Sequence, residues 1–268
     1  MRLDDQQRST NVEDRRGGRA VRLGGGLGGL VVLLLVGYCL GVDPSALLQT
    51  GTELAPSPGT GAAPPPGDEA ADFIAAVLGS TEDVWTEIFG RRGARYPLPT
   101  LVLFDGSVAS ACGFSTAATG PFYCPPDQRV YLDLGFFREL AQMGGPGDFA
   151  AAYVVGHEVG HHVQNVLGAA DRVRDNASSV LLELQADCYA GVWAHHANRR
   201  SAVLEPGDVE EGLAAAQAIG DDRLQGRAGQ TISPESFTHG TSEQRAHWLR
   251  TGIERGSLQA CDTFGRGR

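Results

Sequence analysis

The motif HEVGH occupies residues 157–161, in the middle of the apolar run AAYVVGHEVGHHVQNVL. His157 and His161 are four residues apart, so a helix places both imidazoles on one face, about one turn apart. That spacing suits two ligands of one zinc ion, and Glu158 beside the first histidine can serve as a general base. Two histidines and a glutamate without partners are costly in an apolar core, and a metal removes that cost. The alternative is a pair of hydrogen-bonded core histidines. We therefore expect a buried helix that carries a zinc site.

A catalytic zinc ion needs a third protein ligand and an open fourth position. The metzincin pattern is excluded because Leu167 stands where its third histidine would be. His162 points about 100° around the helix from His161, so it cannot share the same ion. His195 and His196, near the end of a later helical pattern, remain candidates for a site with three histidines.

Glu183 is the better candidate for the third ligand. It lies in LLELQADCYAGVWA, 22 residues after His161, which leaves room for a turn and a returning helix. Asp187 is one turn further along the same face, and its surroundings are largely apolar. This pair predicts a metal ligand, Glu183, with Asp187 accepting the spare N–H of a zinc-binding histidine. The alternative is a solvated acidic edge of the helix.

Apolar periodicity predicts an α+β fold, mostly α, with a small strand region that precedes a helical body. The first apolar helix pattern follows residue 68, and Ser80 with Asp83 resembles a capping box that opens a second helix through Phe89. Strands are expected at LPTLVLF (98–104) and VYLDL (130–134). Further helices are expected at 136–142, 148–167, 177–198, 207–219 and 242–255.

Residues 23–42, LGGGLGGLVVLLLVGYCLGV, carry no charge. At about 1.5 Å per residue, a helix of this length covers the ~30 Å hydrocarbon core of a bilayer. The alternative is a cleaved signal peptide, but no A-x-A site follows closely. Six Arg residues precede the span, and the next one is Arg91. The positive-inside rule therefore predicts a single-pass anchor with a cytoplasmic N-terminus and an extracytoplasmic remainder.

This prediction divides the chain into four parts. Residues 1–22 form a cytoplasmic arm, 23–42 the transmembrane helix, 43–67 a Pro/Gly-rich linker and 68–268 an extracytoplasmic catalytic domain. The formal net charge of −10 argues against a general affinity for nucleic acid or anionic lipid. The oligomeric state stays open.

Four of the five cysteines lie in the expected extracytoplasmic domain, where disulfides form and persist. Four cysteines allow three pairings. We favour a local pair, Cys112 with Cys124, which leaves Cys188 to join Cys261 and hold the C-terminal tail against a helix. The alternative is that some are buried free thiols.

Six blocks of the chain form a combined pattern: NVEDRRG (11–17), GPFYCPPDQRVYLDL (120–134), HEVGHHVQ (157–164), ELQADCYAGVWA (183–194), THGTSEQR (238–245) and CDTF (261–264). Together they resemble the bacterial putative neutral zinc metallopeptidases, which are membrane-anchored proteins. The resemblance implies a zincin-like domain with a gluzincin-like site, in which His157, His161 and Glu183 bind zinc and Glu158 acts as base.

THGTSEQR adds a candidate catalytic residue. His239 precedes Gly240 and a Thr-Ser pair that can cap a helix starting near Ser242. A histidine on such a turn can donate a hydrogen bond to the oxyanion that forms when water attacks a carbonyl. The alternatives are a structural role for His239, or Tyr153 or Tyr189 as the donor.

The sequence therefore predicts a membrane-anchored zinc endopeptidase that acts on a protein or peptide. Hydrolysis of another amide, such as a peptide crosslink of the cell wall, uses the same chemistry. A membrane-tethered binding or scaffold protein with a structural zinc site is the alternative from another class. The presence of Glu158 counts against it, because a structural site has no use for a base beside its ligand. No chemistry follows from the NVEDRRG arm.

Overall fold

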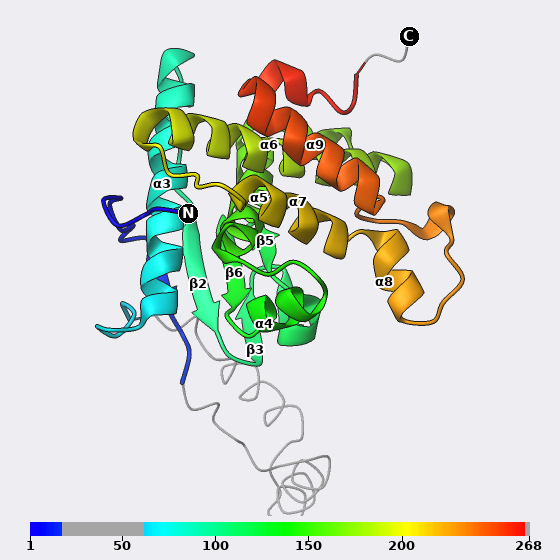
Figure 1. Ribbon diagram of the computed structural model, residues 1–268, viewed down its shortest axis with the longest axis horizontal. Helices are drawn as coiled ribbons and strands as arrows, with labels where there is room; N and C mark the ends of the chain where they lie inside the picture. Colours follow the sequence, from blue (N-terminus) through cyan, green and yellow to red (C-terminus); the bar gives the residue numbers. More distant parts are fainter. Residues whose placement is uncertain (18–61, 266–268) are drawn as a thin grey trace, which may run out of the picture.

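The computed structural model describes residues 1–17 and 62–265. It is mostly helical, with a small sheet against which the helices pack, so the α+β expectation is confirmed (Figure 1). The predicted transmembrane helix at 23–42 lies outside the described residues, as does the linker up to residue 61. None of the described helices combines the length and the apolar character that a bilayer crossing requires.

The main sheet has four strands in the order β1-β2-β6-β5. Its two central strands, β2 (Thr100–Phe104) and β6 (Arg129–Asp133), are parallel and correspond to the two strands expected from the sequence. β5 (Phe122–Cys124) runs antiparallel to β6 at one edge, and β1 (Val12–Asp14) runs parallel to β2 at the other. A separate hairpin consists of β3 (Ser107–Ser110) and β4 (Gly113–Thr116).

The helices follow the predicted ranges closely after residue 135. Capping boxes begin two of them, with Asp175 and Ser178 at the start of α6, and Thr241 and Gln244 at the start of α9. The helices are α3 (Glu69–Arg91), α4 (Phe136–Gln142), α5 (Asp148–Leu167), α6 (Asn176–Ser201), α7 (Asp208–Ala218), α8 (Asp221–Arg227) and α9 (Ser242–Arg255).

The expected break within the first helical region is wrong. α3 is one continuous helix, capped by the Asp68 side chain, which accepts a hydrogen bond from the Ala71 amide. Ser80 is buried and accepts a hydrogen bond from Trp193 Nε1 at 3.1 Å. Because this hydroxyl has a tertiary partner, it does not cap a second helix.

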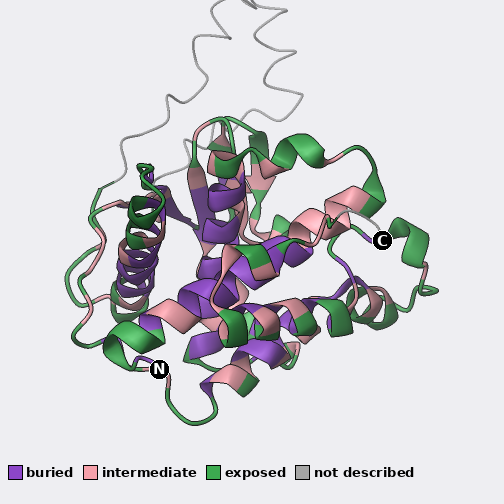
Figure 2. Ribbon diagram, turned by 90° about the horizontal axis from the view of Figure 1, so that it is seen from above, coloured by how far each residue is buried: buried purple, intermediate pink, exposed green. Residues whose placement is uncertain are grey.

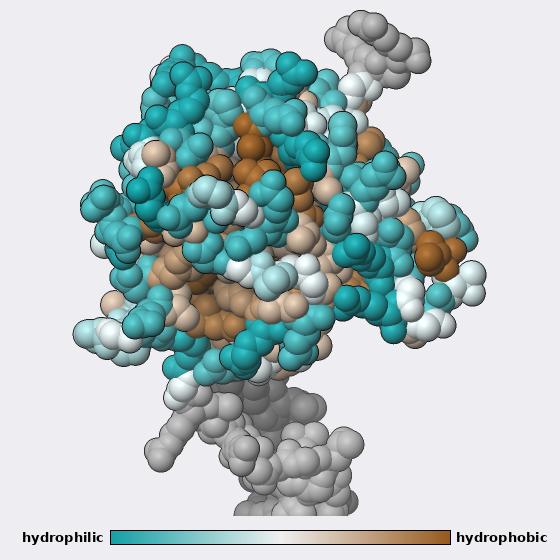
Figure 3. All heavy atoms as spheres, viewed as in Figure 1, coloured by the Kyte–Doolittle hydropathy of each residue, from teal (hydrophilic) through white to brown (hydrophobic). Residues whose placement is uncertain are grey.

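Buried side chains run through the sheet and the inner helices, and exposed residues occupy the periphery (Figure 2). Leu101 and Val130 on one face of the sheet belong to the largest apolar cluster, together with residues of α3, α5 and α6. Val102 and Tyr131 point to the other face, where they pack with Val108 of the β3–β4 hairpin. On the face drawn in Figure 3, the rim is mostly hydrophilic and hydrophobic side chains gather toward the middle.

Helices α6 and α9 approach each other closely through two glycines. A Cβ on Gly252 would lie 2.0 Å from the Cys188 carbonyl oxygen, and one on Gly191 would lie 2.3 Å from the Leu249 carbonyl oxygen. Both contacts are with backbone atoms, which cannot turn aside as a flexible side chain would. The glycines therefore set the spacing of the two helices.

Two disulfides confirm the pairing favoured from the sequence. Cys112 pairs with Cys124, which joins the turn between β3 and β4 to the edge strand β5. Cys188 on α6 pairs with Cys261, which holds the C-terminal segment against that helix.

The N-terminal segment pairs with the sheet of the domain that the sequence predicted to begin at residue 68. The Leu101 amide donates to the Asn11 carbonyl and the Arg15 amide donates to the Leu103 carbonyl, each at 2.8 Å. These bonds make β1 an edge strand of the main sheet. Figure 1 shows the N-terminal segment, in blue, running beside α3 and β2. Sheet pairing between segments this far apart in the sequence leaves no local pattern to detect.

We predict that Gly252→Ala destabilises the fold, because its methyl group must displace the backbone of α6. Overpacking of this kind costs about 1–3 kcal/mol. Gly226→Ala is the matched control, since nothing lies within 4 Å of the added Cβ in α8; a helical Gly→Ala change in open space is neutral or stabilises by up to about 1 kcal/mol. Thermal unfolding of both variants measures the difference. Equal melting temperatures would show that the α6–α9 contact is looser than described.

Candidate metal centre

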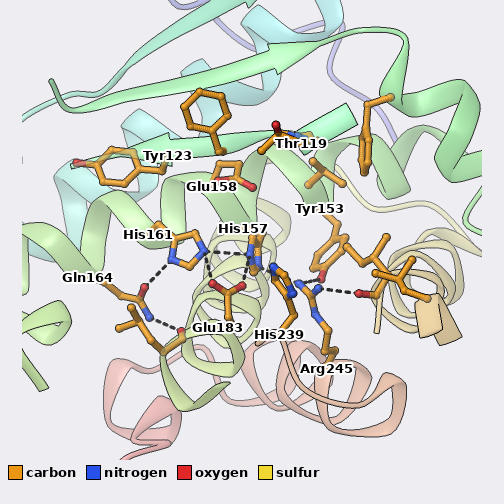
Figure 4. Close-up of a pocket in the computed structure, with 18 of the residues that line it drawn as sticks. Thr119, Tyr123, Tyr153, His157, Glu158, His161, Gln164, Glu183, His239 and Arg245 are labelled. Carbon is orange, nitrogen blue, oxygen red and sulfur yellow. Dashed lines mark hydrogen bonds and ion pairs between the residues drawn. The ribbon is translucent and has the colours of Figure 1, made fainter. Parts of the chain in front are cut away.

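A cavity of about 620 Å³ opens between α5, α6 and the segment that leads into β5. His157, Glu158 and His161 of α5 line it, together with Glu183 of α6. His239 and Arg245, from the loop before α9 and from α9 itself, complete the wall opposite β5 (Figure 4). The sequence motif and the distant carboxylate therefore meet in one hollow.

His157, His161 and Glu183 present their ligand atoms to one point. The two Nε2 atoms are 3.1 Å apart, His157 Nε2 is 3.3 Å from Glu183 Oε2, and His161 Nε2 is 3.4 Å from Glu183 Oε1. Ligands that bind a tetrahedral zinc ion at about 2.0–2.1 Å are separated by roughly 3.3 Å. The two nitrogens and the carboxylate oxygens therefore lie at the separations that ligands of one zinc ion require. Two nitrogens and one oxygen are also a donor set that zinc favours.

Asp187 orients the first histidine. Its Oδ1 atom lies 2.8 Å from His157 Nδ1, so that nitrogen carries the hydrogen and Nε2 is free to face the metal position. The Tyr153 hydroxyl donates to the same oxygen at 2.5 Å. Arg245 donates from Nε to Oδ2 and from Nη2 to Oδ1, both at 2.9 Å. The carboxylate is fully buried, and the hydrogen bonds from Tyr153 and Arg245 fix its orientation beside His157.

Gln164 orients the second histidine in the same way. His161 Nδ1 donates to Gln164 Oε1 at 2.9 Å, which directs the His161 Nε2 atom toward Glu183. The Gln164 amide group donates to the Leu182 carbonyl at 2.7 Å, and to Gln185 Oε1 at 3.2 Å. Gln185 in turn donates to the Cys261 carbonyl at 3.0 Å. The second histidine is thus connected to the segment held by the Cys188–Cys261 disulfide.

The charges in the site are strongly coupled. Burial lowers the pKa of His157, but the neighbouring Asp187 carboxylate outweighs burial and raises that pKa to about 10. Burial raises the pKa of Asp187, but Arg245 and His157 outweigh it and lower that pKa to about 2. Burial also raises the pKa of Glu183, which His161 and His157 together bring well below its ordinary value. An entering metal ion therefore competes with a proton for His157.

Glu158 differs from the other two acids. Its side chain is buried at the cavity, and within the described residues it forms no hydrogen bond or salt bridge, so Arg245 acts on it only at a distance. Burial raises its pKa, and the attraction of His157 and His161 only partly opposes this. A carboxyl group with a raised pKa accepts a proton more readily near neutral pH, which is the property of a general base.

Asp221 holds His239 at the cavity. Asp221 Oδ2 accepts from the backbone amides of Thr238, His239 and Gly240 at 2.7, 2.6 and 3.0 Å. Its Oδ1 lies 3.2 Å from His239 Nδ1, so the other ring nitrogen is left for the cavity. The His239 side chain is about half exposed. The loop before α9 is thereby fixed with its imidazole at the mouth of the site.

The other histidines weighed from the sequence lie elsewhere. His162 Nε2 donates to the Pro97 carbonyl at 2.7 Å, and its Nδ1 lies 2.9 Å from the Tyr123 hydroxyl. His195 and His196 contact the carbonyls of Ile253 and Gly256 at 2.7 and 2.8 Å. These are structural contacts, and the alternative site with three histidines has no geometric basis.

Neither tyrosine considered as an oxyanion donor is available. The Tyr153 hydroxyl donates to Asp187, and Tyr189 packs edge-on against Trp85, outside the cavity wall.

Three residues of the site were not predicted as such from the sequence: Gln164, Asp221 and Arg245. Gln164 lies three residues after His161, the spacing at which helical side chains meet, so helical periodicity contained a signal for it. Arg245 was expected on the first turn of α9, but its partner Asp187 is 58 residues away along the chain. Nothing local connects Asp221 with His239.

Comparison with known proteins places the chain in a family. The model of the family described as "Putative neutral zinc metallopeptidase" matches residues 1–264. The chain is 45% identical over 288 aligned positions to the uncharacterized protein YpfJ of Escherichia coli strain K12, covering 99% of both chains. It is 42% identical over 207 positions to the uncharacterized protein Mb2605 of Mycobacterium bovis, covering 71% of this chain and 69% of the relative. No solved structure matches significantly. The chain belongs to the putative neutral zinc metallopeptidase family.

Proposed function

We propose that the protein is a zinc-dependent endopeptidase with His157, His161 and Glu183 as the metal ligands. The observation that carries the proposal is the convergence of two imidazoles and one carboxylate, in which the Nε2 atoms are 3.1 Å apart and the two Glu183 oxygens lie 3.3 and 3.4 Å from them. The family is described as a zinc peptidase family, which agrees with this donor set. When bound, a zinc ion in such a site lowers the pKa of a water molecule and polarises a carbonyl group.

Glu158 is the general base in this proposal. Its carboxylate accepts a proton from the attacking water and delivers it to the nitrogen of the leaving amine. The raised pKa of Glu158 suits both halves of this transfer, because the group must take up a proton and release it again.

His239 is the group that stabilises the oxyanion. Its Nδ1 atom lies 2.9 Å from the Thr238 hydroxyl, which can donate to it, and in that tautomer Nε2 carries the hydrogen and can donate into the cavity.

The alternative, a structural zinc in a scaffold protein, fits the site less well. Structural zinc sites have four protein ligands and are closed. Here three groups converge among the described residues, and they do so on the wall of an open cavity that also contains Glu158.

The cavity wall also indicates which substrates fit. Tyr153 and Val154 of α5 belong to an apolar cluster against which Phe136, Met143 and Ile219 pack. All five residues line the cavity, and Leu224 of α8 extends the same wall. We propose that this wall receives a large apolar side chain next to the bond that is cleaved.

The assignment of the two carboxylates on α6 predicts different zinc affinities for their variants. Glu183→Gln removes a ligand, so most zinc should be lost under mild chelation. Asp187→Asn removes only the acceptor that orients His157, which should weaken affinity about 10–100-fold. His196→Ala, the control, should keep its zinc. The measurement is zinc content after dialysis against a graded series of chelator.

Loss of metal from Asp187→Asn but not from Glu183→Gln would reverse the assignment. Because Asp187 also pairs with the buried Arg245, circular dichroism must first show that each variant is folded.

Peptide cleavage by the full chain tests the proposed mechanism directly. Glu158→Gln should retain zinc but lower kcat at least ~10²-fold, because amide nitrogen and oxygen cannot accept the proton. His239→Ala should lower kcat about 10²-fold with little change in KM, since the lost hydrogen bond forms only as the oxyanion develops. Full turnover by a zinc-loaded Glu158→Gln variant would exclude Glu158 as the base. An unchanged kcat in His239→Ala would leave that residue a structural role.

A change in the apolar wall should alter substrate preference. Leu224 is 37% exposed, so Leu224→Arg should fold, and it places a charge where the apolar side chain is proposed to bind. Discrimination in favour of large apolar residues should fall about 10-fold or more, measured with a peptide library. Leu98→Arg is the control, since Leu98 is 46% exposed and lies outside the cavity wall. Equal preference in both variants would show that the wall does not contact substrate.

A further inference from the structure

We propose that residues 1–17, which contain the NVEDRRG segment, lie on the same side of any bound membrane as the catalytic domain. The expectation from the sequence was the opposite arrangement, with the N-terminal arm in the cytoplasm and the domain outside. The structure gives the arm a place inside the domain, and the two arrangements cannot coexist in one chain.

The backbone contacts of the arm are those of a true sheet strand. Val12, Glu13 and Asp14 pair in register with Leu101, Val102 and Leu103 of β2. On the other side, the Asp14 amide donates to the Ala62 carbonyl at 2.7 Å. Residues 14 and 62 thus touch each other, although the predicted membrane span falls between them in the sequence. A span that crosses once separates its two flanks by ~30 Å of hydrocarbon.

Side chains of the arm are buried against the domain. Leu3 and Val12 are 5% and 8% exposed, and both belong to the main apolar cluster. The arm passes so close to α3 that a Cβ on Gly79 would lie 2.2 Å from the Gln7 carbonyl oxygen. Next to this point, the Ser9 amide donates to the Ala75 carbonyl at 2.9 Å. Glycine at position 79 is what makes room for the arm.

The arginines of the arm have partners within the domain or the arm itself. Arg8 forms a salt bridge with Asp72 at 2.7 Å, and Arg16 bridges Asp14 and Asp68, each at 2.7 Å. Arg15 pairs with Glu13 at 2.9 Å, and Arg2 donates to the Ala202 carbonyl at 2.9 Å.

These four are the described members of the six arginines on which the positive-inside argument rested. These arginines have partners in the folded domain, so the positive-inside rule is no longer needed to explain their presence before the apolar run. Disulfides form in oxidising compartments, so the Cys112–Cys124 and Cys188–Cys261 bonds favour the outer side for the domain and, with it, for the arm.

Cysteine labelling of the full chain in spheroplasts tests the shared side. Cys39→Ser removes the one cysteine outside the two disulfides, and Thr10→Cys or Glu210→Cys then adds one exposed thiol to the arm or to α7. A maleimide that cannot cross membranes should treat both positions alike, labelling both or neither before the cells are permeabilised. Labelling of Glu210→Cys with protection of Thr10→Cys, or the reverse, would overturn the proposal.

A pair of glycine variants on one helix tests whether the arm is docked in the membrane-bound protein. Gly79→Ala forces a methyl group against Gln7, whereas nothing lies within 4 Å of the Cβ added by Gly90→Ala. If the arm is docked, the unfolding temperature of Gly79→Ala should fall by on the order of 5 °C. The measurement is the temperature at which the protein becomes sensitive to protease in native membranes. If the arm lies across the membrane, both variants should be as stable as the parent or more so, and that result would also overturn the proposal.

Discussion

The buried carboxylate of Asp187 is the interaction on which the site depends. It lies on α6, accepts hydrogen bonds from His157 and Tyr153 of α5, and forms a two-point contact with Arg245 of α9. Removing one member of a buried ion pair costs about 3–5 kcal/mol, because the other charge is left without compensation. A single side chain therefore connects the three helices that carry the site, and it also fixes the orientation of the first histidine.

The rest of the domain supports that arrangement from outside. Gly191 and Gly252 let α6 and α9 approach closely enough for Arg245 to reach Asp187. The Gln164–Gln185 contact connects His161 to the segment that the Cys188–Cys261 disulfide holds. The histidines thus differ in their support, one by an ion pair and the other by neutral amides. The Asp187 carboxylate raises the basicity of His157. Gln164 carries no charge, so the basicity of His161 is raised mainly by Glu183.

The N-terminal segment shows that one sequence pattern can fit two physical explanations. An arginine-rich arm before an apolar run is a sound topological signal. The same arginines form salt bridges with acidic side chains of the folded domain. Only the pairing of β1 with β2 distinguishes a topological signal from a structural role for these arginines. Four of the site residues, by contrast, needed no tertiary information to be found, since HEVGH and the later Glu183 stand out in apolar surroundings.

The sequence by itself determined what short-range physics controls. Helical spacing placed His157 and His161 on one face, capping residues set the start of α9, and the contrast of charge with apolar neighbours marked Glu183 and Asp187. The tertiary structure alone decided the pairings between distant segments: β1 on β2, Arg245 on Asp187, and Asp221 on His239. The paired residues are 18 to 89 positions apart in the sequence, and the residues next to each one contain no pattern that indicates its partner. Contacts of this kind form only when packing has already brought the elements together, so no local propensity encodes them.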